Sequence, residues 1–233
     1  MTVAGPGSAG TGAVEDTAGG PSAAERLDLA DWRRRISDLY AAVRAEAATE
    51  PEAAWRRWRE TREELFRTHP QSPVLVESRA SFRAAHWPYD PRLRFEVALA
   101  EEPAVEPLLG GLTLRLPVST GGEQEFARIG LLAVPFPAGM RSLGLYWMAG
   151  YAGGLFLPFR DATSGHETYG AGRYLLDTAK SADLGPGSEP RSLVLDFNFS
   201  FHPSCAFDPR WSCPLAPPEN RLDLRIEAGE RLS

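Results

Sequence analysis

The chain has 233 residues, enough for one well-cored domain with small appendages. Its 25 basic and 31 acidic side chains leave a formal net charge of −6, and Lys180 is the single lysine. A mildly acidic chain without clustered basic residues argues against nucleic acid as a partner. It also lacks the roughly 18 consecutive apolar residues of a membrane span and the basic and apolar regions of a secretory signal. We therefore expect a cytoplasmic protein with no membrane and no nucleic-acid partner.

The chain divides into three parts by composition. Residues 1–25 are mostly Gly, Ala, Ser and Thr, with too little apolar surface to offset the entropy of ordering, so we expect a disordered tail. Residues 26–70 carry apolar side chains at spacings of three and four, which is typical of amphipathic helices. Residues 71–233 change to a period of two and are expected to form a β domain that carries the sequence motifs.

A pair of helices is predicted within residues 26–70. The apolar stripe of the first comprises Leu29, Trp32, Ile36, Leu39, Tyr40 and Val43. The second is expected to begin at Thr49, because Thr49 and Glu52 fit a capping box and Pro51 suits the first turn. Its stripe comprises Trp55, Trp58, Leu65 and Phe66, and His69-Pro70 ends it. The tryptophans are expected to pack on the sheet that follows, because aromatic residues at helical spacing are usually core.

Seven or eight short strands separated by Gly and Pro turns are predicted in the β domain. Their expected ranges are 93–99, 112–118, 126–134, 143–149, 155–159, 169–176, 193–198 and 222–227. The range 126–134 is apolar on both faces apart from Arg128, so it should be central. The pattern predicts an α+β, mainly β fold: an antiparallel β-sandwich or partly open barrel with two N-terminal helices packed against it.

Two long motifs occupy the second half of the chain. Residues 155–175 read LFLPFRDATSGHETYGAGRYL, residues 196–220 read DFNFSFHPSCAFDPRWSCPLAPPEN, and AGE follows at residues 228–230. With these motifs, and with THPQSP at 68–73 and PYDPRLRFE at 88–96, the chain resembles the bacterial and archaeal family known as domain of unknown function 1684. The resemblance covers nearly everything after the tail and implies little about activity.

The chain departs from the family pattern at Phe201-His202-Pro203, where the family has Tyr-Asn-Pro. Cys205, His202 and Asp196 lie within ten residues, which suggests a thiolate nucleophile with a base and an orienting carboxylate. Because the resemblance places Asn where this chain has His202, an essential general base at that position is not expected. We therefore assign no catalytic residue.

A polar constellation in the motifs is the candidate ligand site. Asp196 and Asn198 alternate with apolar residues and are expected to share one face of their strand, as are Tyr169 and Arg173 on theirs. Arg173 with Asp161 or Asp196 could hold an anionic or hydroxylated ligand, or could form a buried pair that only closes the barrel. The predicted ligand-binding residues are Arg173, Asp161, Asp196, Asn198, Tyr169 and His202.

The two cysteines, Cys205 and Cys213, are separated by seven residues. This spacing exceeds that of common zinc ligands, and only one His lies nearby, so neither a metal nor another cofactor is expected. A disulfide would be geometrically easy, but a cytoplasmic chain should keep it reduced. We favour two buried thiols that behave as small apolar side chains.

Two classes of function remain open. In the first, a pocket between the motifs at 155–175 and 193–220 binds a small polar or anionic molecule, with hydrolysis as an extension. In the second, the motifs only lock the fold, and the helical tryptophan faces or the Pro-rich loop mediate protein association. A concave pocket with convergent polar groups would favour the first class, and a large exposed apolar patch the second.

Overall fold

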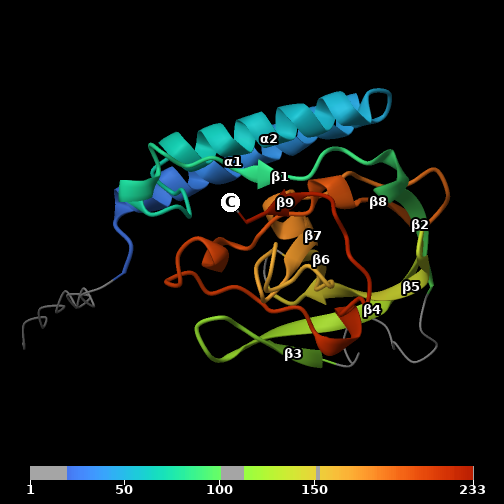
Figure 1. Cartoon of the computed structure of the whole chain (residues 1–233). Coiled ribbons are helices and arrows are strands. Elements are labelled where there is room, and N and C mark those ends of the chain that lie inside the picture. Colours follow the sequence, from blue (N-terminus) through green and yellow to red (C-terminus); the bar gives the residue numbers. More distant parts are fainter. Residues whose placement is uncertain (1–19, 101–112, 151–152, 233) are drawn as a thin grey trace, which may run out of the picture.

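The computed structural model, described for residues 20–100, 113–150 and 153–232, places two helices across one side of a curled antiparallel sheet (Figure 1). The helices are α1 (Ala23–Ala47) and α2 (Pro51–Thr68). The strands are β1 (Ala85–His86), β2 (Arg94–Ala100), β3 (Thr113–Pro117), β4 (Glu123–Phe136), β5 (Gly139–Met148), β6 (Gly154–Phe159), β7 (Arg173–Asp177), β8 (Ser192–Asp196) and β9 (Glu230–Arg231). This half-barrel with an N-terminal helical pair confirms the predicted fold class.

The two helices form a hairpin whose start and turn differ from the prediction. A capping box precedes α1: Ser22 Oγ accepts the Glu25 N–H at 3.2 Å, and the Glu25 carboxylate accepts the Ser22 N–H at 2.7 Å. Residues 23–25 therefore belong to a helix rather than to the tail, of which residues 1–19 lie outside the described part of the chain. The predicted capping box at the start of α2 is wrong, because Glu50 is its N-cap and makes no side-chain cap.

The sheet is organised around β4, as its two apolar faces predicted. The strand order is β7-β6-β5-β4-β2-β8, and β3 also pairs with β4. β5 occupies one edge of β4, while β3 and β2 share the other edge, β3 along residues 123–127 and β2 at residues 131–132. A register shift between Arg128 and Gly130 bends β4 between these two partners. The bend curls the sheet, so the strands enclose a core instead of lying flat.

Three predicted strands are shorter or absent. β7 begins only at Arg173, because Tyr169 to Gly172 forms a tight turn in which the Gly172 N–H bonds the Tyr169 carbonyl at 2.9 Å. β8 ends at Asp196, whose side chain caps a 3-10 turn over Phe197–Phe199. The range 222–227 forms no strand, although it alternates in polarity. Alternation in this range reflects one buried side: the backbone is held by isolated backbone hydrogen bonds to residues 160–162 and by side chains, without forming a continuous strand.

The core has two main layers. One fills the curl of the sheet and includes Leu132, Leu143, Leu157 and Leu195. The other lies between the helical hairpin and the chain that crosses the sheet after β7 and β8. Trp58 is fully buried there against Phe199, and the Trp55 indole donates to the Asn198 carbonyl at 3.0 Å. The expected burial of these two tryptophans in the core is confirmed, although these partners lie in the 3-10 turn after β8 rather than in the main sheet. Complete burial of such a side chain contributes roughly 2–3 kcal/mol.

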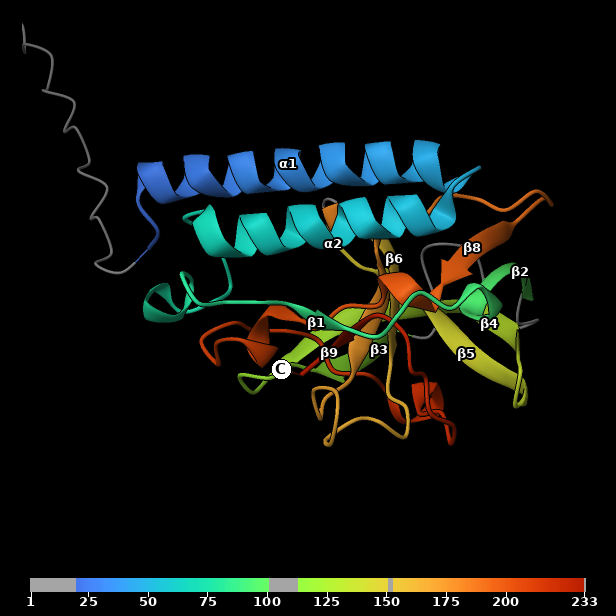
Figure 2. The ribbon, with the colours of Figure 1, turned by 45° about the horizontal axis from the view of Figure 1, so that its top comes forward.

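A short ladder returns the end of the described chain to the hairpin. β1 and β9 pair antiparallel, with His86 opposite Glu230, and both views place this ladder beneath α2 (Figures 1 and 2). The residues just before β9 are therefore held between the helices and the curled sheet. None of the described helices combines the length and the apolar character needed to cross a membrane.

Candidate functional site

Arg173, the centre of the predicted site, is completely buried at the start of β7. Its Nη1 donates to the carbonyl oxygens of Ala228 and Glu230, and its Nη2 donates to that of Ile226 at 2.9 Å. Nη2 also lies 3.5 Å from Oδ1 of Asp161. Burial lowers the pKa of Arg173 to about 10, so the guanidinium remains charged at neutral pH. We name this set, Arg173 with Asp161 and the three carbonyls, the C-terminal brace.

Asp161 links the brace to the turn after β6. Its Oδ2 accepts the Ile226 N–H at 2.7 Å, and both of its oxygens accept the Thr163 hydroxyl at 2.9 Å. Next to it, the Ala162 N–H donates to the Leu224 carbonyl at 2.9 Å. The brace therefore supplies partners for the backbone of 222–228, which explains how that range stays ordered without joining the sheet.

Asp196 and Asn198 form a second, separate lock after β8. Oδ1 of Asp196 accepts the Asn198 N–H at 3.0 Å and its side-chain amide at 2.7 Å. Oδ2 of Asp196 accepts from the Tyr89 hydroxyl at 3.2 Å and from Arg94 at 3.3 Å. The Asn198 side chain also exchanges two hydrogen bonds with the Asp90 backbone, at 2.8 and 2.9 Å. Burial raises the pKa of Asp196, although these donors oppose the rise.

Glu230 joins the motifs to the helical hairpin. Its Oε1 accepts from Nε and Nη2 of Arg62 at 3.0 and 2.7 Å, and its Oε2 accepts the His202 N–H at 2.7 Å. Burial is the largest single effect and would raise the pKa of Glu230, but the Arg62 guanidinium, the two neighbouring imidazoles and the His202 N–H together outweigh it and lower the pKa. Glu230 is therefore a buried carboxylate that connects α2, the 196–220 motif and the AGE sequence.

Sequence reasoning missed Arg62 and Glu230, although each carried a signal. Arg62 falls on the apolar stripe of α2, four residues after Trp58 and three before Leu65, where a charged side chain must be buried. Such a position implies a partner, because an unpaired buried charge costs several kcal/mol. Glu230 lies inside a recognised motif. The sequence did not show that Arg62 and Glu230 form an ion pair, because 168 residues separate them.

His202 and Tyr169 lie beside this junction. Nε2 of His202 accepts the Tyr169 N–H at 3.3 Å, which places the proton of the neutral ring on Nδ1. Burial lowers the pKa of His202 to about 4, so the ring is neutral at pH 7. The Tyr169 hydroxyl hydrogen-bonds the Cys205 thiol. His202 is thus held as a neutral acceptor in the motif junction.

A cavity of about 100 Å³ opens between the helical hairpin and the loop that follows β8; we name it the hairpin cavity. Its walls come from α1, α2, the β7 strand and the 201–214 loop. The lining residues are Trp32, Ile36, Tyr40, Arg62, Phe66, Pro73, Tyr174, Lys180, Ala182, Phe201, His202, Pro203, Ser204, Ser212, Cys213 and Pro214. Two cations, Arg62 and Lys180, belong to this lining, and none of its members is a carboxylate. Both cations pair with carboxylates outside the lining, Arg62 with Glu230 and Lys180 with Asp177, so the cavity combines cationic donors with aromatic walls.

Two hydrogen-bond donors in this lining are unused by the described residues. Arg62 directs Nε and Nη2 at Glu230, which leaves Nη1 without a hydrogen-bond partner in the described part of the chain. The Tyr40 hydroxyl accepts from the Trp58 indole at 3.1 Å, and its own proton has no acceptor among the described residues. Arg62 is 7% exposed and Tyr40 is 3% exposed. The fully buried side-chain atoms that lack a partner in the described residues do not include Arg62 Nη1, so this donor keeps some exposed surface. Because Arg62 and Tyr40 both line the cavity, an acceptor placed there could use both donors.

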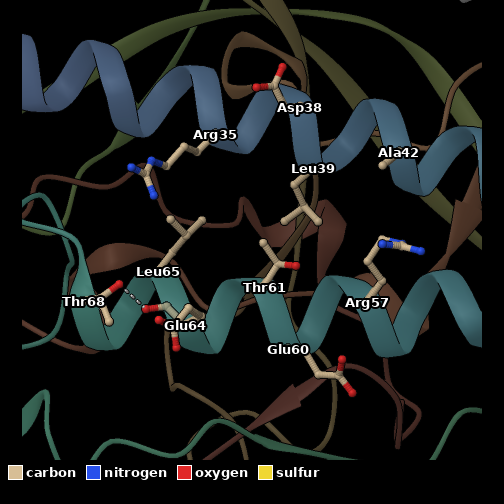
Figure 3. Close-up of a pocket in the computed structure, with 10 residues that line it drawn as sticks. All are labelled: Arg35, Asp38, Leu39, Ala42, Arg57, Glu60, Thr61, Glu64, Leu65 and Thr68. Atoms are coloured by element: carbon tan, nitrogen blue, oxygen red, sulfur yellow. Dashed lines mark hydrogen bonds between the residues drawn. The ribbon is translucent and has the colours of Figure 1, made fainter.

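A larger groove on the outer face of the hairpin, of about 580 Å³, is a weaker candidate. Figure 3 shows Leu39, Thr61 and Leu65 facing one another between the helices, with charged side chains of both signs around them. Its cations already have partners: Arg57 lies 2.6 Å from Glu46, and Arg35 lies 2.7 Å from Asp31. This groove offers neither a uniform charge nor an unsatisfied buried donor.

The six predicted site residues thus fall into separate places. Arg173 and Asp161 share the C-terminal brace, Asp196 and Asn198 share the second lock, and Tyr169 contacts Cys205. Of the six, only His202 lines the hairpin cavity. The prediction that Tyr169 and Arg173, and likewise Asp196 and Asn198, share one face of a strand is wrong, because Tyr169 precedes β7 and Asn198 follows β8. A ligand role for the set stays a prediction.

The fold and these contacts define a class of protein: an antiparallel half-barrel whose motif loops are locked by buried arginine–carboxylate pairs and covered by a helical hairpin. The chain belongs to the family described as "Protein of unknown function (DUF1684)", whose model matches residues 81–231. This confirms the resemblance seen in the motifs. The matched range begins after the helical hairpin, which supplies part of the lining of the hairpin cavity.

A solved relative agrees with this assignment. The chain is similar to the solution NMR structure of an uncharacterized protein from Haloarcula marismortui, with 29% sequence identity and a TM-score of 0.56. The similarity covers 80% of this chain and 97% of that protein. Among curated proteins, none matches the chain.

Proposed function

We propose that the chain binds a small anionic molecule, or the anionic group of a larger one, in the hairpin cavity. The observation that carries the proposal is a pair of donors with no acceptor among the described residues, Arg62 Nη1 and the Tyr40 hydroxyl, in a cavity whose lining includes two cations and no carboxylate. A guanidinium and a phenol are strong donors to carboxylate and phosphate oxygens.

The size of the cavity limits what enters it. A volume of about 100 Å³ equals roughly three water molecules at about 30 Å³ each, which suits a carboxylate or phosphate group better than a whole nucleotide. Lys180 gives further positive charge, although its amine also contacts Asp177 at 2.7 Å and its side chain is 62% exposed. The ligand expected is therefore a small acid whose remainder projects toward solvent past Lys180.

The proposal does not extend to hydrolysis. His202 is the one imidazole of the lining, and its Nε2 already accepts the Tyr169 N–H. A general base must have a free acceptor within reach of the proton that it removes. The protein-association alternative also lacks support at the tryptophan faces, because Trp55 and Trp58 are buried in the core.

Thermal-shift and calorimetric titrations with phosphate, sulfate, acetate and succinate test the proposal, with sodium chloride of matched ionic strength as reference. At least one anion should raise the melting temperature, because a ligand that binds only the folded state stabilises it. Tyr40→Phe should lower the affinity for that anion about tenfold, since it removes one donor to a charged acceptor. Lys180→Gln should lower the affinity a few-fold.

Arg33→Gln is the matched control. Arg33 is an exposed cation of α1 outside the cavity lining, so its loss changes the net charge by the same amount as Lys180→Gln. It should leave binding unchanged. The proposal fails if no anion exceeds the chloride reference, or if Arg33→Gln and Lys180→Gln weaken binding equally.

A further inference from the structure

The two cysteines meet at the wall of the hairpin cavity. The Cys205 N–H donates to Sγ of Cys213 at 3.3 Å, and the two thiols also hydrogen-bond each other. Both are free, and they are 7% and 8% exposed. Two neighbouring thiols differ from the isolated apolar thiols that the sequence favoured, because each sulfur has the other as a potential reaction partner.

The backbone on both sides of the pair is held in place. Cys213 donates its N–H to the Ser119 hydroxyl at 3.1 Å, and its carbonyl accepts the Ser119 N–H at 3.0 Å. Cys205 lies in a 3-10 turn, Ser204–Ala206, closed by the Ala206 N–H on the Pro203 carbonyl at 2.9 Å. The turn after β3 therefore fixes one sulfur, and the motif loop fixes the other.

The surroundings make the two sulfurs unequal. Hydrogen bonds from Cys213, and then from Ser119 and Tyr169, lower the pKa of Cys205 against the opposing effect of burial. The same contact with Cys205, together with burial, raises the pKa of Cys213. Cys205 is thus suited to be the attacking thiolate, and Cys213 the thiol that follows.

No metal-ligand cluster of the described residues includes these thiols. Nowhere in those residues do three or more His, Cys, Asp or Glu side chains gather in a way that could hold an ion. A structural zinc would need such additional ligands beside the two sulfurs. We therefore treat the two cysteines as reactive thiols.

We propose that Cys205 and Cys213 form a reversible dithiol–disulfide pair that a hydroperoxide oxidises. The Cys205 thiolate attacks one peroxide oxygen; an S–O bond forms, the O–O bond breaks, and hydroxide leaves and is protonated to water. The Cys213 sulfur then attacks the sulfur of the Cys205 sulfenic acid; the S–S bond forms, the S–O bond breaks, and the leaving hydroxide takes the Cys213 thiol proton to become a second water. The two thiols lose two electrons in total, and a dithiol reductant restores them.

The hairpin cavity is the route of access for the oxidant. Cys213 lines this cavity together with Ser212 and Pro214, and hydrogen peroxide is only slightly larger than the water molecules that fit there. Cys205 contacts Cys213 and follows Ser204, which also lines the cavity. The disulfide would consequently form part of the wall of the anion site, although the redox proposal does not depend on anion binding.

Hydrogen peroxide treatment of the full chain, followed by intact mass and a peptide map under denaturing conditions, tests this proposal. The expected product is one intramolecular Cys205–Cys213 disulfide, seen as a loss of two hydrogens per chain and reversed by dithiothreitol. Two thiols that remain titratable, a stable gain of oxygen atoms, or a disulfide between two chains would each overturn it.

Variants separate the roles of the two sulfurs. Cys213→Ser should stop at a sulfenic acid on Cys205 that dimedone labels, and Tyr169→Phe should slow oxidation about tenfold because the thiolate loses a donor. Tyr89→Phe is the matched control, since its hydroxyl contacts Asp196 and not a cysteine. Equal rates for the two tyrosine variants would remove Tyr169 as a positioning residue, and dimedone labelling of wild type without a disulfide would overturn the pairing.

Discussion

At the scale of single residues, the motifs are explained by buried charges that need partners. Arg173 and Asp161 are both fully buried, and so are nearly all atoms of Arg62 and Glu230. A charge moved out of water is tolerated only when a counter-charge and hydrogen bonds compensate it. The Arg62–Glu230 pair joins segments 168 residues apart, and the Arg173–Asp161 pair, within one motif, binds the backbone at Ile226, so both pairs connect distant parts of the chain.

The role of Arg173 is testable through Arg173→Met, which keeps the stem and removes the charge. We expect a loss of about 3–5 kcal/mol in the free energy of unfolding, because Asp161 remains buried without its counter-charge and three carbonyls lose a donor. Urea denaturation measures this change. Arg225→Met is the control: its side chain is 47% exposed and its ion pairs lie at the surface, so we expect a much smaller change.

The same variant addresses the ligand role predicted for Arg173 from the sequence. A stable Arg173→Met protein that no longer responds to the anions would favour Arg173 as a binding residue over Arg62. A variant as stable as Arg225→Met that still binds would show that the C-terminal brace contributes little. Marked destabilisation is the result that the brace predicts.

At the scale of elements, the tight turn before β7 determines where Arg173 enters the sheet. Gly172 has φ +101°, and a Cβ at this position would collide with the Phe159 carbonyl of the neighbouring strand. Phe159 is also the residue paired with Arg173 across the β6–β7 ladder. The glycine therefore allows the two backbones to approach closely at the point where the guanidinium enters the core.

Gly172→Ala and Gly121→Ala together separate backbone strain from crowding. Gly121 has φ +84°, but a Cβ there meets no atom within 4 Å, so the substitution should cost about 1 kcal/mol. Gly172→Ala adds a backbone collision and should cost at least about 2 kcal/mol more. Urea midpoints of the two variants measure the difference. Equal losses would mean that the β6 backbone yields freely at this turn.

At the scale of the whole molecule, buried imidazoles make the stability depend on pH. Burial lowers the pKa of both His86 and His202 from 6.5 to about 4, while Glu230 beside them acts in the opposite direction. Between pH 4 and 6.5 the unfolded chain binds these protons and the folded chain does not. The free energy of unfolding therefore falls as the pH decreases through this window, and these groups leave it constant above about pH 7.

Denaturation at a series of pH values tests this dependence. The decrease attributable to the buried His202 should be on the order of 3 kcal/mol by pH 4. His202→Gln, which keeps an acceptor for the Tyr169 N–H, should reduce the slope between pH 4 and 6.5. His166→Gln is the control, because His166 is exposed. A slope that His202→Gln leaves unchanged would show that another group titrates in this window.

The local pattern of apolar and polar residues determined much of the secondary structure of this protein. The spacing of apolar residues by three and four identified both helices, and alternation identified most strands, including the central position of β4. These signals succeed because neighbouring side chains along a helix or strand share an environment. The 222–227 range shows where alternation misleads, since one buried side is equally compatible with a chain held by side-chain hydrogen bonds.

Only the tertiary structure decided which polar side chains meet. Asp196 and Asp161 were equal partners for Arg173 by sequence, and the turn at Gly172 together with the return of 226–230 selects Asp161. The hairpin cavity likewise needs Tyr40 and Arg62 from the helices to face Cys213 from the motif loop. Such contacts depend on how distant segments are brought together in the fold. A charged residue on an apolar stripe, such as Arg62, indicates that a buried partner exists, but the sequence does not identify which residue it is.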